Sequence, residues 1–457
     1  MAGISIAMLT GDNGILQKAT DAKEQTGIGQ EKEIVALAYN SALANKVGNG
    51  DSTAVTAGDL NFELINQRAI AGGSNPITVT FTDSKRQYTI NANGEIIYAG
   101  IKNGDEQDGN ELPTALGTKP YFPSDKFKQL EGTDLTTGLV ITDKSENEEI
   151  GNEYVWIEVP STAVDSTATG GPDYTGVVGA TDYTNISAAL KNYCAKDANG
   201  GDLITSSSTD IWDDGCGISS SEDYDNLYHI MLKSVYENGG FWIGRYEAGT
   251  GTARNNGDSA SGITPLSKID LYPINYVTCG EAQTIATNVP NKGSYNSSLM
   301  FGIQWDLVLR HLSNKGVDTS LLTGTSESWG NYDLAYDLNQ STAHGFKLGY
   351  QYKVMGGSTI IPWSTIEIGF THPKTVVITP GNSSGVPAYA FSSGATTRNM
   401  QKNIYDLAGN MEEYTLETDG TSPIARGGLC MPGYNLVTTR HIQSGSYYFG
   451  SFRVCIY

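Results

Sequence analysis

Apolar residues near the amino terminus follow the three- and four-residue spacing of a helix. Ile34, Leu37 and Ser41, together with Ala38 and Ala42, fall on one side when GQEKEIVALAYNSALANK is wound as an α-helix. A helix of this kind draws most of its stability in water from the surface that its apolar side covers. The pattern therefore predicts a helix that packs on a neighbouring element.

The residues that follow alternate between apolar and polar, as strands do. Residues 77–81 and 88–90 predict two strands, and the Asn-Gly pair at 93–94 predicts a turn into a further strand. A second helix is expected over residues 59–70. We therefore expect an amino-terminal domain over residues 1–100, in which a helix covers a small antiparallel sheet.

A polar stretch separates this domain from the rest of the chain. Residues 101–130 are rich in Gly, Asp and Pro and have no apolar period, which is typical of a linker. We expect a second, loop-rich domain over residues 131–457. The predicted fold class is therefore α+β.

The first part of the second domain predicts a hairpin and an insertion. Residues 138–143 (GLVITD) and 154–160 (YVWIEVP) are β-rich and flank a charged turn. Residues 161–222 are heavy in Ser, Thr, Asp and Gly, and we expect a surface insertion because they offer little to bury. A helix is expected over residues 224–237.

Composition and charge narrow the class of protein. The 457 residues exceed what one hydrophobic core usually organises, so the length favours two or three domains. The formal net charge is -21, from 50 acids and 29 bases, and no Lys/Arg-rich stripe is present, so nucleic acid is not an expected partner. The 54 glycines and 26 tyrosines favour a loop-rich extracellular protein over a helical cytosolic enzyme.

The cysteines predict neither a disulfide framework nor a metal site. The five are scattered, odd in number and not arranged as CxxC. A bridge between Cys194 and Cys216 stays open at this point. Cys279 and Cys455 are expected to be small buried apolar residues.

The first 100 residues carry a resemblance. AGISIAMLTGDNGILQKATDAKEQT, followed by the amphipathic helix, resembles the start of pilin-like proteins of Gram-positive anaerobes. The apolar run Met1–Leu9 is too short to cross a bilayer, which needs about 20 residues. The resemblance implies a longer apolar helix upstream of this chain as the only membrane contact, a cell-surface location, and other pilin subunits as partners.

The second domain carries a broader resemblance, which covers about residues 130–457. Four separated segments and two closing ones occur in the order typical of the formylglycine-generating-enzyme family, which has a C-type-lectin-like fold: FWIGRYEAG (241–249), YPINYVTCGEAQTIA (272–286), SLMFGIQWDLVLRHL (298–312), NIYDLAGNMEEYT (403–415), ARGG (425–428) and SFRVCIY (451–457). The residues themselves require no enzyme. Trp242, Trp305, Tyr405 and Tyr414 are the large residues expected in a core, and Gly409-Asn410 suits a tight turn.

The chain departs from the oxidases of this family where they carry catalysis. Those oxidases place a Ser after the Gly-Gly pair and then two copper-binding cysteines. Counted without gaps, these positions are Leu429, Pro432 and Val437 here, and Cys430 is out of register. The five histidines have no clustered spacing that would suit iron. We therefore expect no enzyme activity and no cofactor; acidic loops are compatible with calcium but do not identify a site.

Between ARGG and the last strand lies a segment whose apolar and aromatic residues follow neither helical nor strand spacing. Loops of this kind usually lie on the surface, and aromatic clusters there mark binding sites. We expect ligand contacts from Leu429, Cys430, Met431, Tyr434, Asn435, Leu436, Val437, His441, Ile442, Gln443, Tyr447, Tyr448 and Phe449. The alternative is that about half of these pack inward, among them Leu429 or Met431, and Phe449.

The segment also resembles the variable region of proteins diversified by retroelements, which use the same lectin-like scaffold. Their retargeting replaces template adenines, so an Asn codon becomes Tyr, Leu, Val, His, Ile, Phe or Cys, which fill most of the segment. Met431 and Gln443 need other template codons. The sequence thus predicts a cell-surface receptor or adhesin that binds a protein or other macromolecular ligand. The alternatives are a minor pilin of a filament tip and a degenerate copper oxidase.

Overall fold

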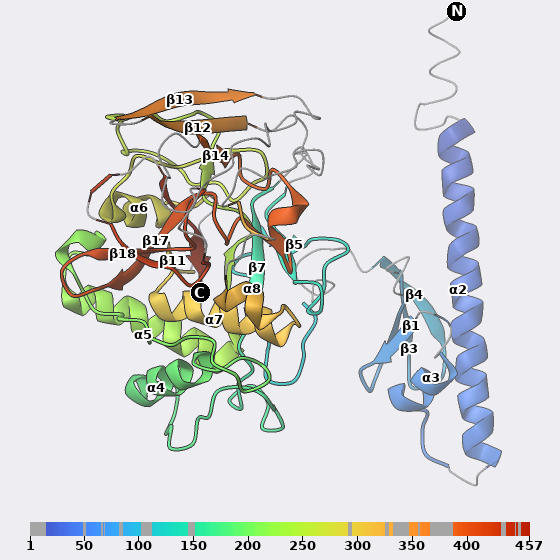
Figure 1. Cartoon of the computed structure of the whole chain (residues 1–457). Helices are drawn as coiled ribbons and strands as arrows, with labels where there is room; N and C mark the ends of the chain where they lie inside the picture. Colours follow the sequence, from blue (N-terminus) through green and yellow to red (C-terminus); the bar gives the residue numbers. More distant parts are fainter. Residues whose placement is uncertain are drawn as a thin grey trace, which may run out of the picture. The chain divides into compact units, whose positions relative to one another are not determined.

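The structure is a computed structural model. It describes residues 15–457 apart from 49–51, 65–66, 68, 82–85, 102–111, 145–150, 291–294, 325–328, 332–346, 355–356, 366–386, 431–435, 444 and 447–448. The chain forms two compact units, Met1–Glu111 and Leu112–Tyr457 (Figure 1). Both helices and sheets are present, as expected for the α+β class.

The first unit is a long helix with a short helix and a four-stranded sheet. The strands are antiparallel in the order β1-β2-β3-β4. A capping box between Thr56 and Asp59 starts the short helix. The elements are α2 (Ile15–Gly48), α3 (Ala57–Glu63), β1 (Ala69–Gly72), β2 (Ile77–Phe81), β3 (Arg86–Ile90) and β4 (Ile96–Ile101). The predicted strands at 77–81 and 88–90 are confirmed, whereas the helix expected over 59–70 ends early and gives way to β1.

The side of α2 that packs on the sheet matches the predicted one only in part. Val35, Ala38 and Ala42 are buried, whereas Leu37 is 64% exposed and Ser41 is also exposed. Tyr88 of β3 fixes the helix, because its buried hydroxyl donates to the carbonyl of Ile28 at 3.0 Å. The prediction for Leu37 is therefore wrong: α2 has apolar residues on both sides, and spacing alone did not identify the covered one.

The boundary between the units also differs from the predicted linker. Residues 102–111 lie outside the described residues, but residues 112–130 belong to the second unit. Leu112 and Phe127 are buried in its core, and Lys128–Gln129 forms the edge strand of its main sheet. Isolated apolar residues thus anchor a stretch whose average composition is that of a linker.

The main sheet of the second unit joins strands from both ends of the domain. Its order is β11-β21-β8-β7-β6-β5, and every pairing is antiparallel. The strands are β5 (Lys128–Gln129), β6 (Val140–Thr142), β7 (Glu153–Glu158), β8 (Gly240–Gly244), β11 (Ser297–Leu299) and β21 (Val454–Ile456). The predicted hairpin is confirmed as β6 and β7. The carboxy-terminal strand β21 lies inside the sheet and closes the domain.

Helices of the second unit pack on this sheet and on one another. They are α4 (Tyr183–Cys194), α5 (Ser221–Asn238), α6 (Cys279–Ala286), α7 (Gly302–Asn314) and α8 (Thr319–Thr323), with 3₁₀ turns at Asp214–Cys216 and Thr397–Asn399. Helix α5 contacts β8, and α7 contacts both α4 and β7. The helix predicted over 224–237 is confirmed as α5. Gly239 ends it in the left-handed region, at φ 69°.

Residues 161–222 are not only a surface insertion. They include α4, whose Ile186, Leu190 and Cys194 are buried in the main core, together with Leu203. The prediction that this stretch offers little to bury is therefore wrong. A few apolar residues at helical spacing place part of it inside the domain despite its polar average.

Smaller sheets complete the second unit. A four-stranded sheet has the order β19-β18-β17-β20, in which β17 and β20 are parallel. Its strands are β17 (Glu412–Thr418), β18 (Pro423–Arg426), β19 (Arg440–Ile442) and β20 (Gly450–Phe452). A three-stranded sheet contains β12 (Lys347–Val354), β13 (Gly357–Thr365) and β14 (Pro387–Phe391), and two-stranded pairs are formed by β9 (Gly249–Thr250) with β10 (Tyr272–Pro273) and by β15 (Met400–Gln401) with β16 (Ile404–Tyr405).

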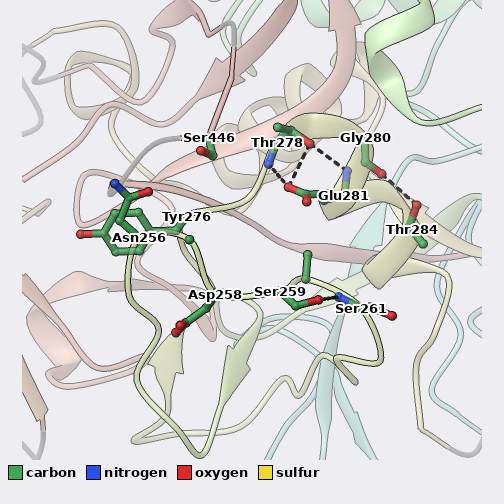
Figure 2. A pocket seen from close by; sticks show the side chains of 12 residues that line it. Asn256, Asp258, Ser259, Ser261, Tyr276, Thr278, Gly280, Glu281, Thr284 and Ser446 are labelled. Carbon is green, nitrogen blue, oxygen red and sulfur yellow. Dashed lines mark hydrogen bonds between the residues drawn. The ribbon is translucent and has the colours of Figure 1, made fainter.

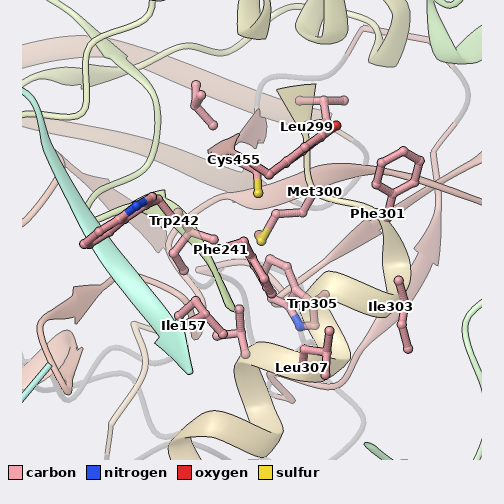
Figure 3. Close-up of a cluster of buried hydrophobic side chains, with 14 of the residues drawn as sticks. Ile157, Phe241, Trp242, Leu299, Met300, Phe301, Ile303, Trp305, Leu307 and Cys455 are labelled. Carbon is pink, nitrogen blue, oxygen red and sulfur yellow. The ribbon is translucent and has the colours of Figure 1, made fainter. Parts of the chain in front are cut away.

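The core between the main sheet and α7 is aromatic. Trp242 of β8 and Trp305 of α7 are fully buried, as predicted, and Figure 3 shows Trp305 beside Phe241 and Leu307. Trp156 packs edge-on against Trp242, with ring centroids 5.0 Å apart. Over the residues that the structure describes, no helix is both long and apolar enough to cross a membrane.

Candidate functional site

The carboxy-terminal segment between β18 and β20 leaves the small sheet and returns to it. Strand β19 pairs with β18, so that Arg440, His441 and Ile442 lie beside Arg426, Ala425 and Ile424. Strand β20 then pairs with β17 on its other edge. Both ends of the segment are therefore held by the same sheet.

The expected ligand residues divide into three groups. Burial removes four from the surface: Leu429, Cys430, Val437 and Phe449. Leu436, His441 and Gln443 are half-buried, and Ile442 is 53% exposed. The remaining five lie outside the described residues: Met431, Tyr434, Asn435, Tyr447 and Tyr448.

The four buried residues are corrected from ligand contacts to core residues. Leu429, Cys430 and Phe449 form a small cluster with Met411 and Ala390, and Val437 belongs to the main core. Burial of these apolar side chains removes them from water, which stabilises the folded state. The part of the segment able to meet a ligand is correspondingly smaller than the sequence predicted.

A buried ion-pair network lies beneath the segment. Arg426 is fully buried between Asp306 and Glu417, and its Nη1 lies 2.5 Å from Glu417 Oε2. Burial alone would lower the pKa of Arg426, but the two carboxylates raise it above its usual value. Burial raises the pKa of Asp306, although both neighbouring guanidinium groups oppose this. Removal of one partner from such a network strongly destabilises the fold, because it leaves a buried charge unpaired.

Arg440 connects β19 to this network. Its Nη2 lies 3.1 Å from Asp306 Oδ2, and its Nε lies 2.9 Å from Glu417 Oε1. It also donates to the carbonyl of Ser206. Arg440 thus points toward the scaffold, and it fixes the start of β19 against α7 and β17.

A third buried carboxylate, Glu412, binds the side chains of His441 and Gln443. Glu412 is fully buried, and its Oε1 lies 2.8 Å from Nδ1 of His441. Its Oε2 accepts a hydrogen bond from Nε2 of Gln443 at 3.0 Å. His441 and Gln443 are therefore partly used by the scaffold, and Ile442 between them is exposed.

Scaffold groups also hold the segment through its backbone. Trp305 Nε1 donates to the carbonyl of Val437 at 3.1 Å, and the Tyr414 hydroxyl donates to that of Gly445 at 2.8 Å. The Gln443 amide donates to the carbonyl of Pro423, and the carbonyl of Phe449 accepts from the Glu412 amide. None of these four bonds depends on the side chain that the segment contributes.

Sequence reasoning missed Arg440 and Glu412. The signal for Glu412 was the pair Glu412-Glu413 within a strand that also contains Tyr414, because consecutive acids in a buried strand need partners. Glu413 has such a partner, since Arg453 binds it with Nε and Nη2 at 3.1 and 2.7 Å. No local signal indicated that Arg440 reaches α7.

The cysteines do not gather. All five are free and buried, so Cys194 and Cys216 do not form the disulfide that the sequence left open. Cys279 and Cys455 are buried as expected. Burial raises the pKa of the Cys430 thiol well above its ordinary value, which disfavours a thiolate. Within the described part of the chain, no three His, Cys, Asp or Glu side chains come together as metal ligands would.

Comparison of the chain with protein-family models, with curated proteins and with solved structures found no match to any of them.

Proposed function

We propose that the second unit is a C-type-lectin-like domain of the formylglycine-generating-enzyme type that binds a protein or other macromolecule at the cell surface. The ordered motifs between residues 241 and 457 support the fold assignment, together with the buried positions of their aromatic residues. The proposed ligand face comprises Leu436, His441, Ile442 and Gln443, extended by Met431, Tyr434, Asn435, Tyr447 and Tyr448. The protein acts as a receptor or adhesin and not as an enzyme.

The observation that carries this proposal is the way the segment is held. Its backbone carbonyls bond to Trp305 and Tyr414, which belong to the scaffold. Its ends are buried, and its middle exposes Ile442. A loop fixed through its backbone can change exposed side chains without changing its path, which is what a ligand face under diversification requires.

This arrangement also supports retargeting by a retroelement. Adenine replacement in Asn codons would yield the Tyr, Leu, His and Ile residues of the proposed ligand face, whereas Trp305 and Tyr414 lie outside the segment. Replacement would thus leave the two donors Trp305 Nε1 and the Tyr414 hydroxyl unchanged. The proposed location is the cell surface, with the first unit as the pilin-like part of an anchor.

A display experiment tests the binding proposal. Residues Ile442, Tyr447 and Tyr448 are randomised together in the full chain, and the library is selected against hen lysozyme as a defined protein target. We expect most members to stay folded. We also expect binders to emerge, because a few aromatic side chains usually contribute most of the binding energy of such an interface. A matched library at the buried Leu429, Val437 and Phe449 positions should mostly unfold. Equal unfolding of both libraries, or no binders from the first, would contradict the proposal.

A minor pilin remains the second candidate, and one observation favours it. Leu37, Leu43 and Val47 are exposed on α2, at 64%, 41% and 68%, away from the side that covers the sheet. Exposed apolar residues suit contact with another subunit. Leu37→Asp should abolish incorporation into filaments if this is the main role. A receptor would keep ligand capture in the same variant.

A further inference from the structure

Strand β19 is the outer edge of the small sheet that holds the carboxy-terminal segment. The order β19-β18-β17-β20 gives β19 a neighbouring strand on one side, where it pairs with β18. It also carries Ile442, the exposed residue of the proposed ligand face. The edge of a sheet presents backbone N–H and C=O groups that can pair with another chain. The side of β19 that faces away from β18 is therefore a candidate for such pairing.

The register shows which backbone groups of β19 point outward. The Gln443 amide donates to the carbonyl of Pro423, so the backbone of Gln443 faces β18. Because the backbone groups of successive residues in a strand point to opposite edges, His441 also faces β18, whereas Arg440 and Ile442 face away from it. Among the described residues, the backbone N–H and C=O groups of Arg440 and Ile442 have no hydrogen-bond partner. These groups therefore form an open edge.

Side chains hold this edge in place from within the domain. Arg440 is bound by Asp306 and Glu417. His441 is bound by the buried Glu412. The strand contains no proline, so each of its residues keeps a backbone N–H. The edge is thus fixed in the extended form before a ligand arrives, which lowers the entropy that binding costs.

The cavity beside the segment offers a ligand less than this edge does. It has a volume of about 840 Å³ and is lined by the loop at 256–261, by the start of α6 and by Ser446 (Figure 2). Figure 2 shows hydrogen bonds that join Thr278 to Glu281 and Thr284 to Gly280. The groups of this wall thus bond to one another, whereas the described residues leave the outer edge of β19 without partners.

We propose that the ligand is a polypeptide that adds an extended segment to the outer edge of β19. Alternating donors and acceptors at the spacing of a strand are what a polypeptide backbone supplies and what a carbohydrate lacks. The net charge of -21 disfavours nucleic acid. The inference rests on the proposed function, because it takes the carboxy-terminal segment as the ligand face, and it adds the class of ligand and the way in which that ligand binds.

Backbone pairing is compatible with a face whose side chains change. The hydrogen bonds to Arg440 and Ile442 would not depend on which side chain replaces Ile442, provided that the new residue is not proline. In strand addition the backbone bonds supply affinity, and the side chains decide which sequence is preferred. Diversification at β19 would therefore alter the preferred sequence and keep the mode of binding.

The test uses linear peptides and the full chain. A phage-displayed library of random linear dodecapeptides is selected against the protein, and the strongest binders are titrated by calorimetry into Ile442→Pro and Ile442→Val. Proline removes the outward N–H, and edge strands tolerate it where that N–H bonds to no other strand. Valine keeps the N–H and the branched side chain. We expect the proline variant to bind on the order of tenfold more weakly than the valine variant.

A second measurement leaves the protein unchanged, so it decides the case if the proline variant is unstable. Synthetic copies of the strongest peptide carry one N-methyl group each, at successive backbone positions. Because alternate amides of an added strand would face β19, methylation should weaken binding on the order of tenfold at every second paired position and little at the positions between. In hydrogen exchange, the Ile442 amide should be protected only in the complex and the His441 amide with or without peptide.

Three results would overturn the inference. They are a selection that yields no linear peptide, equal binding to the proline and valine variants, and losses on methylation that do not alternate along the peptide. If peptides pair with β19 but the lysozyme selection yields nothing, strand addition stands and the proposed side-chain face fails. If lysozyme binders emerge and the peptides fail these tests, the face stands and strand addition is wrong.

Discussion

Acid should destabilise the second unit through one buried histidine. His311 of α7 is 2% exposed, and its Nδ1 accepts the backbone amide of Glu158 at 3.0 Å. Its Nε2 is buried without a hydrogen-bond partner among the described residues. Burial is the main cause that lowers the pKa of His311, from 6.5 to about 3. Protonation of Nδ1 would turn this acceptor into a donor that faces another donor.

The sign and the magnitude follow from the two pKa values. Because the pKa is lower in the folded state, the unfolded chain binds more protons between about pH 3 and pH 6.5. The contribution to stability is therefore present above pH 6.5 and is lost as the pH falls. Between pH 7 and pH 5 the loss amounts to about 2 kcal/mol.

A second buried group acts in the opposite direction. Burial raises the pKa of Asp210 from 3.8 to about 6, with Glu417 as a further cause. The folded state then binds more protons between these values, so acid stabilises it by about 1.3 kcal/mol between pH 7 and pH 5. In the wild type the contributions of His311 and Asp210 therefore partly cancel. The informative quantity is the loss of stability between pH 7 and pH 5, compared between the wild type and a variant that keeps Asp210.

The variant His311→Asn supplies that difference. Its side-chain oxygen can accept the Glu158 amide, but it does not titrate. All six tryptophans lie in the second unit, so urea unfolding followed by tryptophan fluorescence reports that unit alone. We expect the wild type to lose about 2 kcal/mol more than the variant between pH 7 and pH 5. Equal losses in the two proteins would refute the assignment of a depressed pKa to His311.

Four further predictions use the same assay, a thiol titration or a measurement of oxygen consumption. Arg426→Met should cost about 3–5 kcal/mol, because Asp306 and Glu417 would stay buried with only the partly exposed Arg440 to pair with them; a cost below about 1 kcal/mol would disprove the role of the network. Val437→Ala should cost about 2 kcal/mol and Ile442→Ala less than about 0.5 kcal/mol, and reversed values would contradict the placement of the two side chains. The five buried thiols should react slowly with a thiol reagent until the chain is denatured, and fast labelling of the native chain would argue against this. With copper and a Cys-containing peptide the protein should consume no oxygen, and turnover would argue against the absence of oxidase activity.

Local patterns predicted the elements whose side chains alternate or repeat clearly. The strand hairpin of β6 and β7, the helix α5 and the buried positions of Trp242 and Trp305 were all expected from the sequence. Each depends on residues close together in the chain. Their structure therefore follows from spacing, turn residues and size.

What the sequence did not predict depends on contacts between distant residues. Strand β21 lies between β8 and β11, and Arg440 reaches Asp306, more than a hundred residues earlier. Leu37 and Val35 are both apolar, and only the packing of α2 on the sheet decides that Val35 is buried. In the ligand segment, burial of Val437 follows from its place beside Trp305 and not from its neighbours in sequence.

The proposal that the carboxy-terminal segment is a retargetable ligand face on a fixed scaffold is tested most directly at the DNA level. The measurement compares the 3′ end of the gene with its genomic neighbourhood, to find a reverse transcriptase gene and an imperfect repeat of the segment. We predict that the two copies differ at adenines of the repeat, at codons between Leu429 and Phe449, and agree at the codon of Arg453. The absence of such a repeat, or differences spread evenly over all bases and codons, would contradict the proposal.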